Sequence, residues 1–128
     1  MRGKSCQWAR YAARTWSARA TAARLSLERW LQYHYAWREW LPRNWRALGA
    51  CETGYGREPG NWYHDSGTHV SAFGITRHNY AVNAARIGLL SWDETRRRLG
   101  RYPTPREQYL NALSHLATYG DGWTCPGP

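Results

Sequence analysis

The chain has 128 residues, of which 18 are lysine or arginine and nine are aspartate or glutamate, so its formal net charge is +9 at pH 7. This length accommodates one modest hydrophobic core and an extension, and the basic excess favours an anionic partner such as nucleic acid, cell wall or anionic lipid. A transmembrane helix is excluded, because no window approaches the roughly 20 apolar residues that a membrane span needs. We also expect no ordinary signal peptide, because arginine interrupts the apolar residues of the basic segment 1–25.

The chain has three cysteines, Cys6, Cys51 and Cys125, and none of them forms a CxxC pair. They fit neither a zinc cluster nor a disulfide-dense scaffold, and one disulfide with one leftover thiol is the simplest arrangement. The histidines of the glycine-rich region also match no compact zinc pattern. We therefore expect neither a metal nor a cofactor.

Residues 8–41 carry large or apolar side chains at intervals of three and four, with most arginines off this stripe. The spacing predicts one long amphipathic helix, about 50 Å long at roughly 1.5 Å per residue, which Pro42 stops. A helix of this kind usually packs on a partner or on a second copy of itself; binding to a membrane surface or to nucleic acid is the alternative. We divide the chain into a basic helical segment, 1–43, and a compact domain, 44–128.

The compact domain is predicted to begin with a short helix and a turn-rich loop. The helix is capped by Asn44 and ends at Gly54. Glycine recurs through residues 54–70, together with Pro59, which is typical of turns. The run VSAFGI, at 70–75, could supply one strand of a small hairpin.

Further helices are predicted at 79–88, 91–100 and 106–120. Ser91 and Glu94 have the spacing of a capping box, which supports the start of the second of these helices. The last helix has one apolar face at helical spacing, which we expect to pack on the domain. That face consists of Tyr109, Leu110, Leu113, Leu116 and Ala117.

Glu52 lies at the C-terminal end of the first predicted helix of the domain, beside Cys51 and before a loop rich in tryptophan and tyrosine. Partial desolvation and the negative end of the helix dipole would both raise the pKa of a carboxyl group at this place. A carboxylic acid that stays protonated near neutral pH can act as a general acid on the leaving oxygen of a glycosidic bond. The position alone is more typical of a solvated surface residue.

Two motifs of the domain resemble, in the same order, the motifs of one known family. The first is W-x5-C-E-T-G followed by N-W, at Trp45, Cys51, Glu52, Asn61 and Trp62, and the second is TPREQYLNALSHLATYGDGWTCPG. Together they resemble the resuscitation-promoting factors and related lysozyme-like transglycosylases of actinobacteria and their phages, over residues 45–126. The resemblance implies a mainly α, lysozyme-like α+β fold, in which a small helical domain carries a short β-hairpin and a cleft for peptidoglycan.

The resemblance also assigns roles to individual residues. It implies that Glu52 is the catalytic acid, that Cys51 and Cys125 form a disulfide, and that Trp123 is a packing residue. On the chain-entropy model, closing a loop of about 75 residues contributes roughly 4 to 5 kcal/mol. Such a bond would join the helix that carries Glu52 to the C-terminal tail.

The chain departs from the family pattern at three places. ETGYGREPGNW replaces the shorter ESGGNW directly after the acid, and Thr76 stands where the turn SAFGIT would be expected to carry a glutamine. The long basic helix stands where the family usually has a signal peptide. The first two differences imply a reshaped cleft wall and altered substrate binding.

Hydrolysis ordinarily needs a second carboxylate, and Asp65 is the candidate, with a turn-forming role in HDSG as the alternative. Glu58, the other carboxylate of the loop, is expected at the surface. The residues predicted to contact the glycan are Asn61, Trp62, Tyr63, Phe73, Thr76 and Tyr80. For each of the aromatic residues, packing in the core is the alternative.

The first functional hypothesis is a phage-associated lytic transglycosylase, in a virion or a lysis system and active at the cell wall. Glu52 would cleave the MurNAc–GlcNAc β-1,4 bond as general acid and base, with the 6-hydroxyl of muramic acid as the attacking group. The expected partner of the domain is a glycan strand of peptidoglycan. The N-terminal helix is expected to bind a virion or tail protein, or a second copy of the chain. The alternative is a structural or wall-binding virion protein with an inactive lysozyme-like domain. Nucleic-acid binding through the arginine-rich helix would show steep salt dependence, and we expect no specific nucleic-acid partner.

Overall fold

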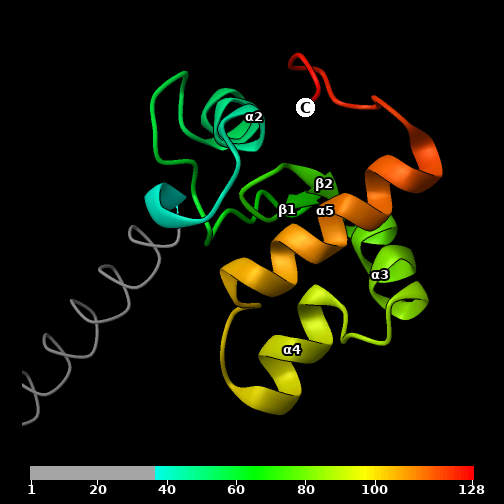
Figure 1. Cartoon of the computed structure of the whole chain (residues 1–128). Coiled ribbons are helices and arrows are strands. Elements are labelled where there is room, and N and C mark those ends of the chain that lie inside the picture. The colour runs from blue at the N-terminus through cyan, green and yellow to red at the C-terminus, as the bar shows by residue number, and fades with distance from the viewer. Residues whose placement is uncertain (1–36) are drawn as a thin grey trace, which may run out of the picture. The chain divides into compact units, whose positions relative to one another are not determined.

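The computed structural model describes residues 37–128 (Figure 1). The predicted N-terminal helix, 8–41, therefore lies almost entirely outside the described residues. The elements in chain order are α2 (Arg43–Thr53), β1 (His69–Val70), β2 (Ile75–Thr76), α3 (Arg77–Arg86), α4 (Trp92–Leu99) and α5 (Pro105–Tyr119). The predicted combination of helices with a small β-hairpin is confirmed.

The two strands form an antiparallel pair in which His69 lies opposite Thr76 and Val70 opposite Ile75. The run VSAFGI thus contributes to both strands and to the turn between them. Helix α5 packs against α3, and the chain beyond α5 returns to α2 (Figure 1). None of the described helices is long and apolar enough to cross a membrane.

Helix α2 begins after a proline and ends at a glycine. Pro42 is the N-cap residue, and its carbonyl accepts a hydrogen bond from Arg46 N at 2.9 Å. The predicted Asn44 cap is wrong, because the N-cap lies two residues earlier, at Pro42, and the helix has no side-chain cap. The predicted end at Gly54 is confirmed; a Cβ atom there would lie 2.2 Å from the carbonyl oxygen of Arg57, so only glycine fits.

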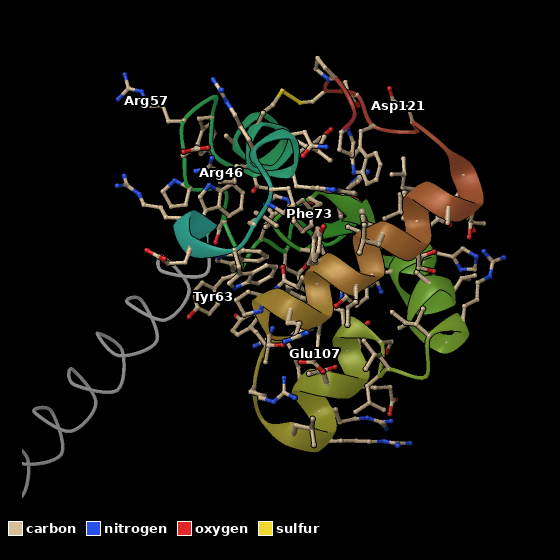
Figure 2. The ribbon with its side chains drawn as sticks, in the orientation of Figure 1. Arg46, Arg57, Tyr63, Phe73, Glu107 and Asp121 are labelled. Carbon is tan, nitrogen blue, oxygen red and sulfur yellow. A yellow bond between two sulfur atoms is a disulfide. The ribbon has the colours of Figure 1, made fainter. Side chains whose placement is uncertain are left out.

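The core is a cluster of aromatic rings in the middle of the domain, around Phe73 (Figure 2). Trp62 meets Trp37 and Phe73 edge to face, with ring centroids 5.3 Å and 5.7 Å apart, and Trp45 meets Phe73 at 5.5 Å. Each such pair adds about 0.5–1.5 kcal/mol beyond the burial of its area. Trp37, which the sequence placed on the stripe of the N-terminal helix, is thus a core residue of this domain.

Helices α3, α4 and α5 are each capped by a side chain. Ser91 accepts a hydrogen bond from Glu94 N at the start of α4, as its spacing predicted. Thr104 and Glu107 form a complete capping box at the start of α5. Caps of this kind stabilise a helix by about 1 kcal/mol each, and they fix the start of α5 one residue before the predicted position.

The predicted packing face of α5 is wrong. The buried side is largely polar, whereas Leu110 is 40 % exposed. Its buried residues are Pro105, Gln108, Asn111, Ala112 and His115. A polar face is buried here because the hairpin and the neighbouring loops present backbone groups that need hydrogen-bond partners.

Gln108, which is 0 % exposed, satisfies three of these backbone groups. Its Oε1 accepts a hydrogen bond from Ala72 N at 2.9 Å, and its Nε2 donates to the carbonyls of Trp62 at 2.8 Å and Pro103 at 2.9 Å. One side chain thereby joins α5 to the hairpin turn, to the loop after α2 and to the segment before α5.

We expect Gln108→Leu to lower the free energy of unfolding by at least about 3 kcal/mol, because it leaves three buried backbone groups without partners at roughly 1–3 kcal/mol each. Urea denaturation followed by circular dichroism measures the loss. Leu110→Ala, in the same helix, is the matched control and should cost less than about 1 kcal/mol. A larger loss for Leu110→Ala than for Gln108→Leu would contradict the observed burial of α5.

Candidate active site

Glu52 lies in the last turn of α2, where neighbouring segments fix its position. The next residue, Thr53, donates a hydrogen bond to the carbonyl of Ala72 at 2.8 Å and accepts one from Asn61 N at 2.7 Å. The Glu52 side chain approaches the hairpin turn so closely that a Cβ atom on Gly74 would lie 3.1 Å from its Oε2. Gly74 also has φ +61°, which favours glycine.

The C-terminal tail contacts the Glu52 carboxyl group through its other oxygen, Oε1. The predicted disulfide between Cys51 and Cys125 is confirmed, with the Cα atoms 6.1 Å apart (Figure 2, yellow bond). The backbone N–H of Cys125 donates a hydrogen bond to Glu52 Oε1 at 3.0 Å. Trp123 donates from Nε1 to the carbonyl of Phe73 at 2.8 Å, which ties the tail to the hairpin turn.

A cavity of about 100 Å³ opens beside Glu52. Its walls come from the end of α2, the hairpin, the start of α3, the middle of α5 and the tail. The lining residues are Glu52, His69, Gly74, Ile75, Thr76, Asn79, His115, Gly122, Trp123 and Thr124. Groups that donate and accept hydrogen bonds thus surround one carboxyl group.

Glu52 differs electrostatically from most other carboxylates of the domain. Arginine side chains pair with Glu58, Asp65, Asp93, Glu94 and Glu107. Glu39 and Asp121 are exposed, and Glu52 is half-buried with no arginine or lysine partner within residues 37–128. Among these residues its Oε2 has no hydrogen-bond partner, so this oxygen is available to a ligand in the cavity.

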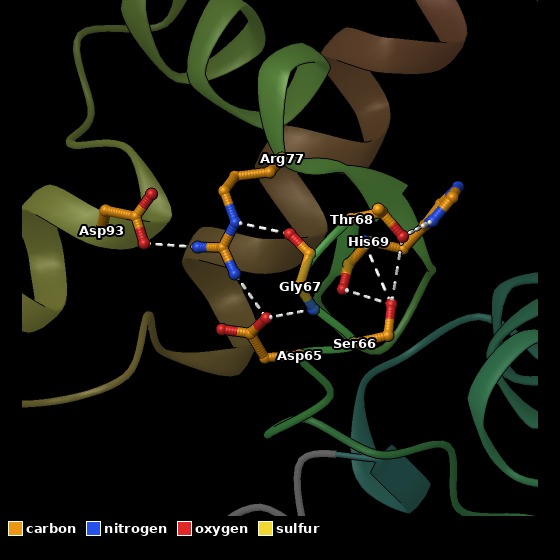
Figure 3. Close-up of polar contacts among 7 residues, drawn as sticks. All are labelled: Asp65, Ser66, Gly67, Thr68, His69, Arg77 and Asp93. Carbon is orange, nitrogen blue, oxygen red and sulfur yellow. Dashed lines mark hydrogen bonds and ion pairs between the residues drawn. The ribbon is translucent and has the colours of Figure 1, made fainter.

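The structure does not bring Asp65 to this cavity. Asp65 pairs with Arg77, whose guanidinium group also pairs with Asp93 and donates from Nε to the carbonyl of Gly67 at 3.0 Å (Figure 3). The hydrogen bond from Arg77 is the main cause that holds the pKa of Asp65 below its usual range. Asp65 therefore has the turn-forming role that was the alternative, because it joins the turn before β1 to α3. It is absent from the residues that line the cavity beside Glu52.

Three of the predicted glycan contacts are core residues instead. Trp62, Phe73 and Tyr80 are each at most 3 % exposed, so no ring face is free to stack on a sugar. The physical reason is the small size of the domain, whose interior uses these rings as its main apolar volume. Burial also raises the pKa of Tyr80 far above its ordinary value.

The remaining predicted contacts have different surroundings. Thr76 lines the cavity and caps α3 by accepting a hydrogen bond from Asn79 N. Asn61 is exposed, and its Oδ1 accepts from Tyr63 N at 2.9 Å. Tyr63 is half-buried and meets Tyr102 edge to face at 4.9 Å. Thr76 is the one of these three that shares the cavity with Glu52.

Sequence reasoning missed His69, Asn79 and His115 as cavity residues. A signal was present for His115, because Gln108, Asn111 and His115 follow one another at helical spacing and form a polar stripe on α5. For His69 and Asn79 we find no local signal, since the fold of the hairpin decides their direction. Within residues 37–128, no group of three histidine, cysteine, aspartate or glutamate side chains is arranged to hold a metal ion.

Comparisons of the chain with models of protein families, with curated proteins and with solved structures find no match.

The disulfide is expected to contribute strongly to stability. Replacing both Cys51 and Cys125 by serine should lower the free energy of unfolding by about 4 kcal/mol, because the crosslink closes a loop with a sequence separation of 74 residues. Urea denaturation of the double variant, compared with the oxidised parent, measures this loss. Equal stability of the two proteins would contradict the prediction.

Stability should fall as the pH is lowered. Burial lowers the pKa of His115 below 6.5, and burial is also the main cause that lowers the pKa of His64. Each imidazole therefore binds a proton less readily in the folded state than in the unfolded chain, so their contribution to stability is present above about pH 6.5 and is lost as the pH falls through the folded pKa values. The urea midpoint should be lower at pH 5.5 than at pH 7.5, and His115→Gln should reduce this difference.

Proposed function

We propose that this chain is a peptidoglycan-cleaving enzyme of the lysozyme-like type, a lytic transglycosylase in which Glu52 is the general acid and base. The observation that carries the proposal is a half-buried carboxyl group, unpaired within the described residues, beside a polar cavity in a domain where most carboxylates are paired with arginine. The motif around Trp45, Cys51 and Glu52, with the closing motif that ends at Cys125, supports the same activity through its family resemblance.

Each oxygen of Glu52 has a separate part in the proposed reaction. Oε1 accepts the hydrogen bond from Cys125 N, which fixes the orientation of the carboxyl group. Oε2 carries the proton and delivers it to the bridging oxygen as the glycosidic bond breaks. The carboxylate then accepts the proton of the substrate's 6-hydroxyl group as that oxygen bonds to the anomeric carbon, which gives a 1,6-anhydro product and restores the acid.

The composition of the cavity favours transglycosylation over hydrolysis. Glu52 is the one carboxylate among the lining residues that belong to the described part of the chain. Hydrolysis by the usual routes requires a second carboxylate, as nucleophile or as the base that activates water. Intramolecular attack by the substrate needs a single acid–base residue.

A second function, glycan binding without cleavage, is favoured by the size of the cavity. Its volume of about 100 Å³ is smaller than the roughly 300–1,000 Å³ of pockets that enclose a small molecule. A polymer would therefore lie mostly on the surface around it. In either case our proposal includes a phage-associated setting at the bacterial cell wall, because the resembling family extends to phages.

Glu52→Gln should reduce the release of soluble muropeptides from actinobacterial peptidoglycan by at least about 100-fold, the typical contribution of a general acid. The fold should persist, because the amide oxygen can still accept the hydrogen bond from Cys125 N. Mass spectrometry of the products measures the release and identifies anhydro or reducing ends.

The matched control is Glu58→Gln, which removes an exposed carboxylate that pairs with Arg46 at 3.8 Å. It should release products at the parental rate. Full activity of Glu52→Gln would contradict the proposed mechanism, and binding without product release by the parent would favour the second function.

A further inference from the structure

A chain of buried hydrogen bonds leads from the backbone of α3 to the cavity. It begins at the carbonyl oxygen of Tyr80, which can only accept, and which receives a hydrogen bond from Asn111 Nδ2 at 2.9 Å. This contact fixes the orientation of the Asn111 amide. Its Oδ1 then accepts from Asn83 Nδ2 at 3.2 Å, so the amide of Asn83 is oriented as well. Both asparagines are at most 1 % exposed.

The same Asn83 Nδ2 lies 3.1 Å from His115 Nδ1. Because the amide nitrogen is a donor, Nδ1 must be the unprotonated acceptor, and the ring proton lies on Nε2. Rotating both amides by 180° would place Asn111 Oδ1 next to the carbonyl oxygen of Tyr80, and two acceptors cannot form a hydrogen bond. In the observed arrangement the carbonyl oxygen of Tyr80, Oδ1 of Asn111 and Nδ1 of His115 each accept a hydrogen bond. Asn83 Oδ1 is left without a partner among the described residues.

The Nε2 side of the His115 ring is directed toward the cavity that contains Glu52. His115 lines that cavity, and a Cβ atom on Gly122, another lining residue, would lie 3.9 Å from Nε2. Trp123 and Tyr119 hold the ring, with centroids at 5.0 Å and 4.8 Å. Burial lowers the pKa of His115, which agrees with a neutral ring. Within residues 37–128, Nε2 has no hydrogen-bond partner.

A donor fixed in this way requires an acceptor on its ligand, because His115 cannot change its tautomer without breaking the bond to Asn83. Hydroxyl groups of a sugar can pair with a donor or with an acceptor, so they do not depend on a fixed donor. The acetamido carbonyl oxygen of an amino sugar only accepts, so it is the group whose binding depends on a donor at this place. We infer that His115 Nε2–H donates a hydrogen bond to the acetamido carbonyl oxygen of the amino sugar bound beside Glu52, an inference that rests on the proposed function.

Two substitutions separate this role from a structural one. In His115→Gln the side-chain amide reaches roughly the place of Nε2 and keeps a donor toward the cavity, but it loses the contact with Asn83. In His115→Asn the shorter amide stays near the place of Nδ1 and loses the donor toward the cavity. A purely structural role would make His115→Asn the milder change.

The binding test uses the Glu52→Gln protein, so that cleavage does not interfere. The two probes are peptidoglycan and the same peptidoglycan after de-N-acetylation. The Glu52→Gln protein should bind the acetylated form roughly tenfold more tightly, the difference that one neutral hydrogen bond can make. Adding His115→Gln should retain this preference, and adding His115→Asn should reduce it about tenfold, beyond any preference caused by the positive charge of the freed amines. Equal binding of the two probes by the Glu52→Gln protein, or a preference that His115→Asn leaves unchanged, would overturn the inference.

The tautomer has an independent test, which does not depend on folding of a variant or on activity. The ring ¹⁵N chemical shifts of His115 in the parent at pH 7.5 should show an unprotonated Nδ1 and a protonated Nε2; the reverse pattern would overturn the inference. Selective binding of the acetylated probe without product release by the parent would overturn the proposed cleavage and leave the role of His115 supported.

Discussion

The bond between Cys51 and Cys125 is the constraint on which the candidate site depends. It joins the last turn of α2 to a tail that is far away in the sequence, and it brings the backbone N–H of Cys125 to Glu52 Oε1. The same tail supplies Trp123 and Gly122 to the cavity wall. This covalent link thus acts together with the hydrogen bond from Trp123 to Phe73 in holding the tail, and with it the orienting hydrogen bond, beside the carboxyl group.

Helix α5 organises the rest of the site through polar side chains rather than apolar ones. Near its start, Gln108 holds the hairpin turn that approaches Glu52. Two turns further along, His115 reaches the cavity and is held by Asn83. Buried polar groups are costly unless they are satisfied, and the backbone groups of the hairpin and of α3 satisfy them here. A helix with a conventional apolar face would pack more simply, but it would position neither the hairpin turn nor the imidazole.

The charged side chains of the domain also serve mainly to position its segments. Arginine exceeds the acidic residues in number, and most carboxylates are used in pairs at the surface, such as Asp65 with Arg77. Exposed pairs contribute little to stability, about 0–1 kcal/mol each. Their effect here is to fix the positions of loops. Arg77, at the start of α3, joins the turn at Gly67 to Asp93 in α4. Glu52 remains outside this pairing because the hairpin turn and the tail surround it.

Features that depend on local chemistry can be predicted from the residues alone. Proline, glycine and capping residues act on the backbone within one turn, so the end of α2 at Gly54 and the start of α4 at Ser91 could be predicted. The pairing of Cys51 with Cys125 could be expected because two motifs of the sequence resemble those of a family in which the corresponding cysteines are joined. Three features could be learned only from the folded chain: the buried side of α5, the aromatic rings that form the core, and the pairing of Asp65 with Arg77. Those outcomes depend on contacts between distant residues, such as Gln108 with Trp62, and a buried backbone group can select a polar side chain over the leucine beside it.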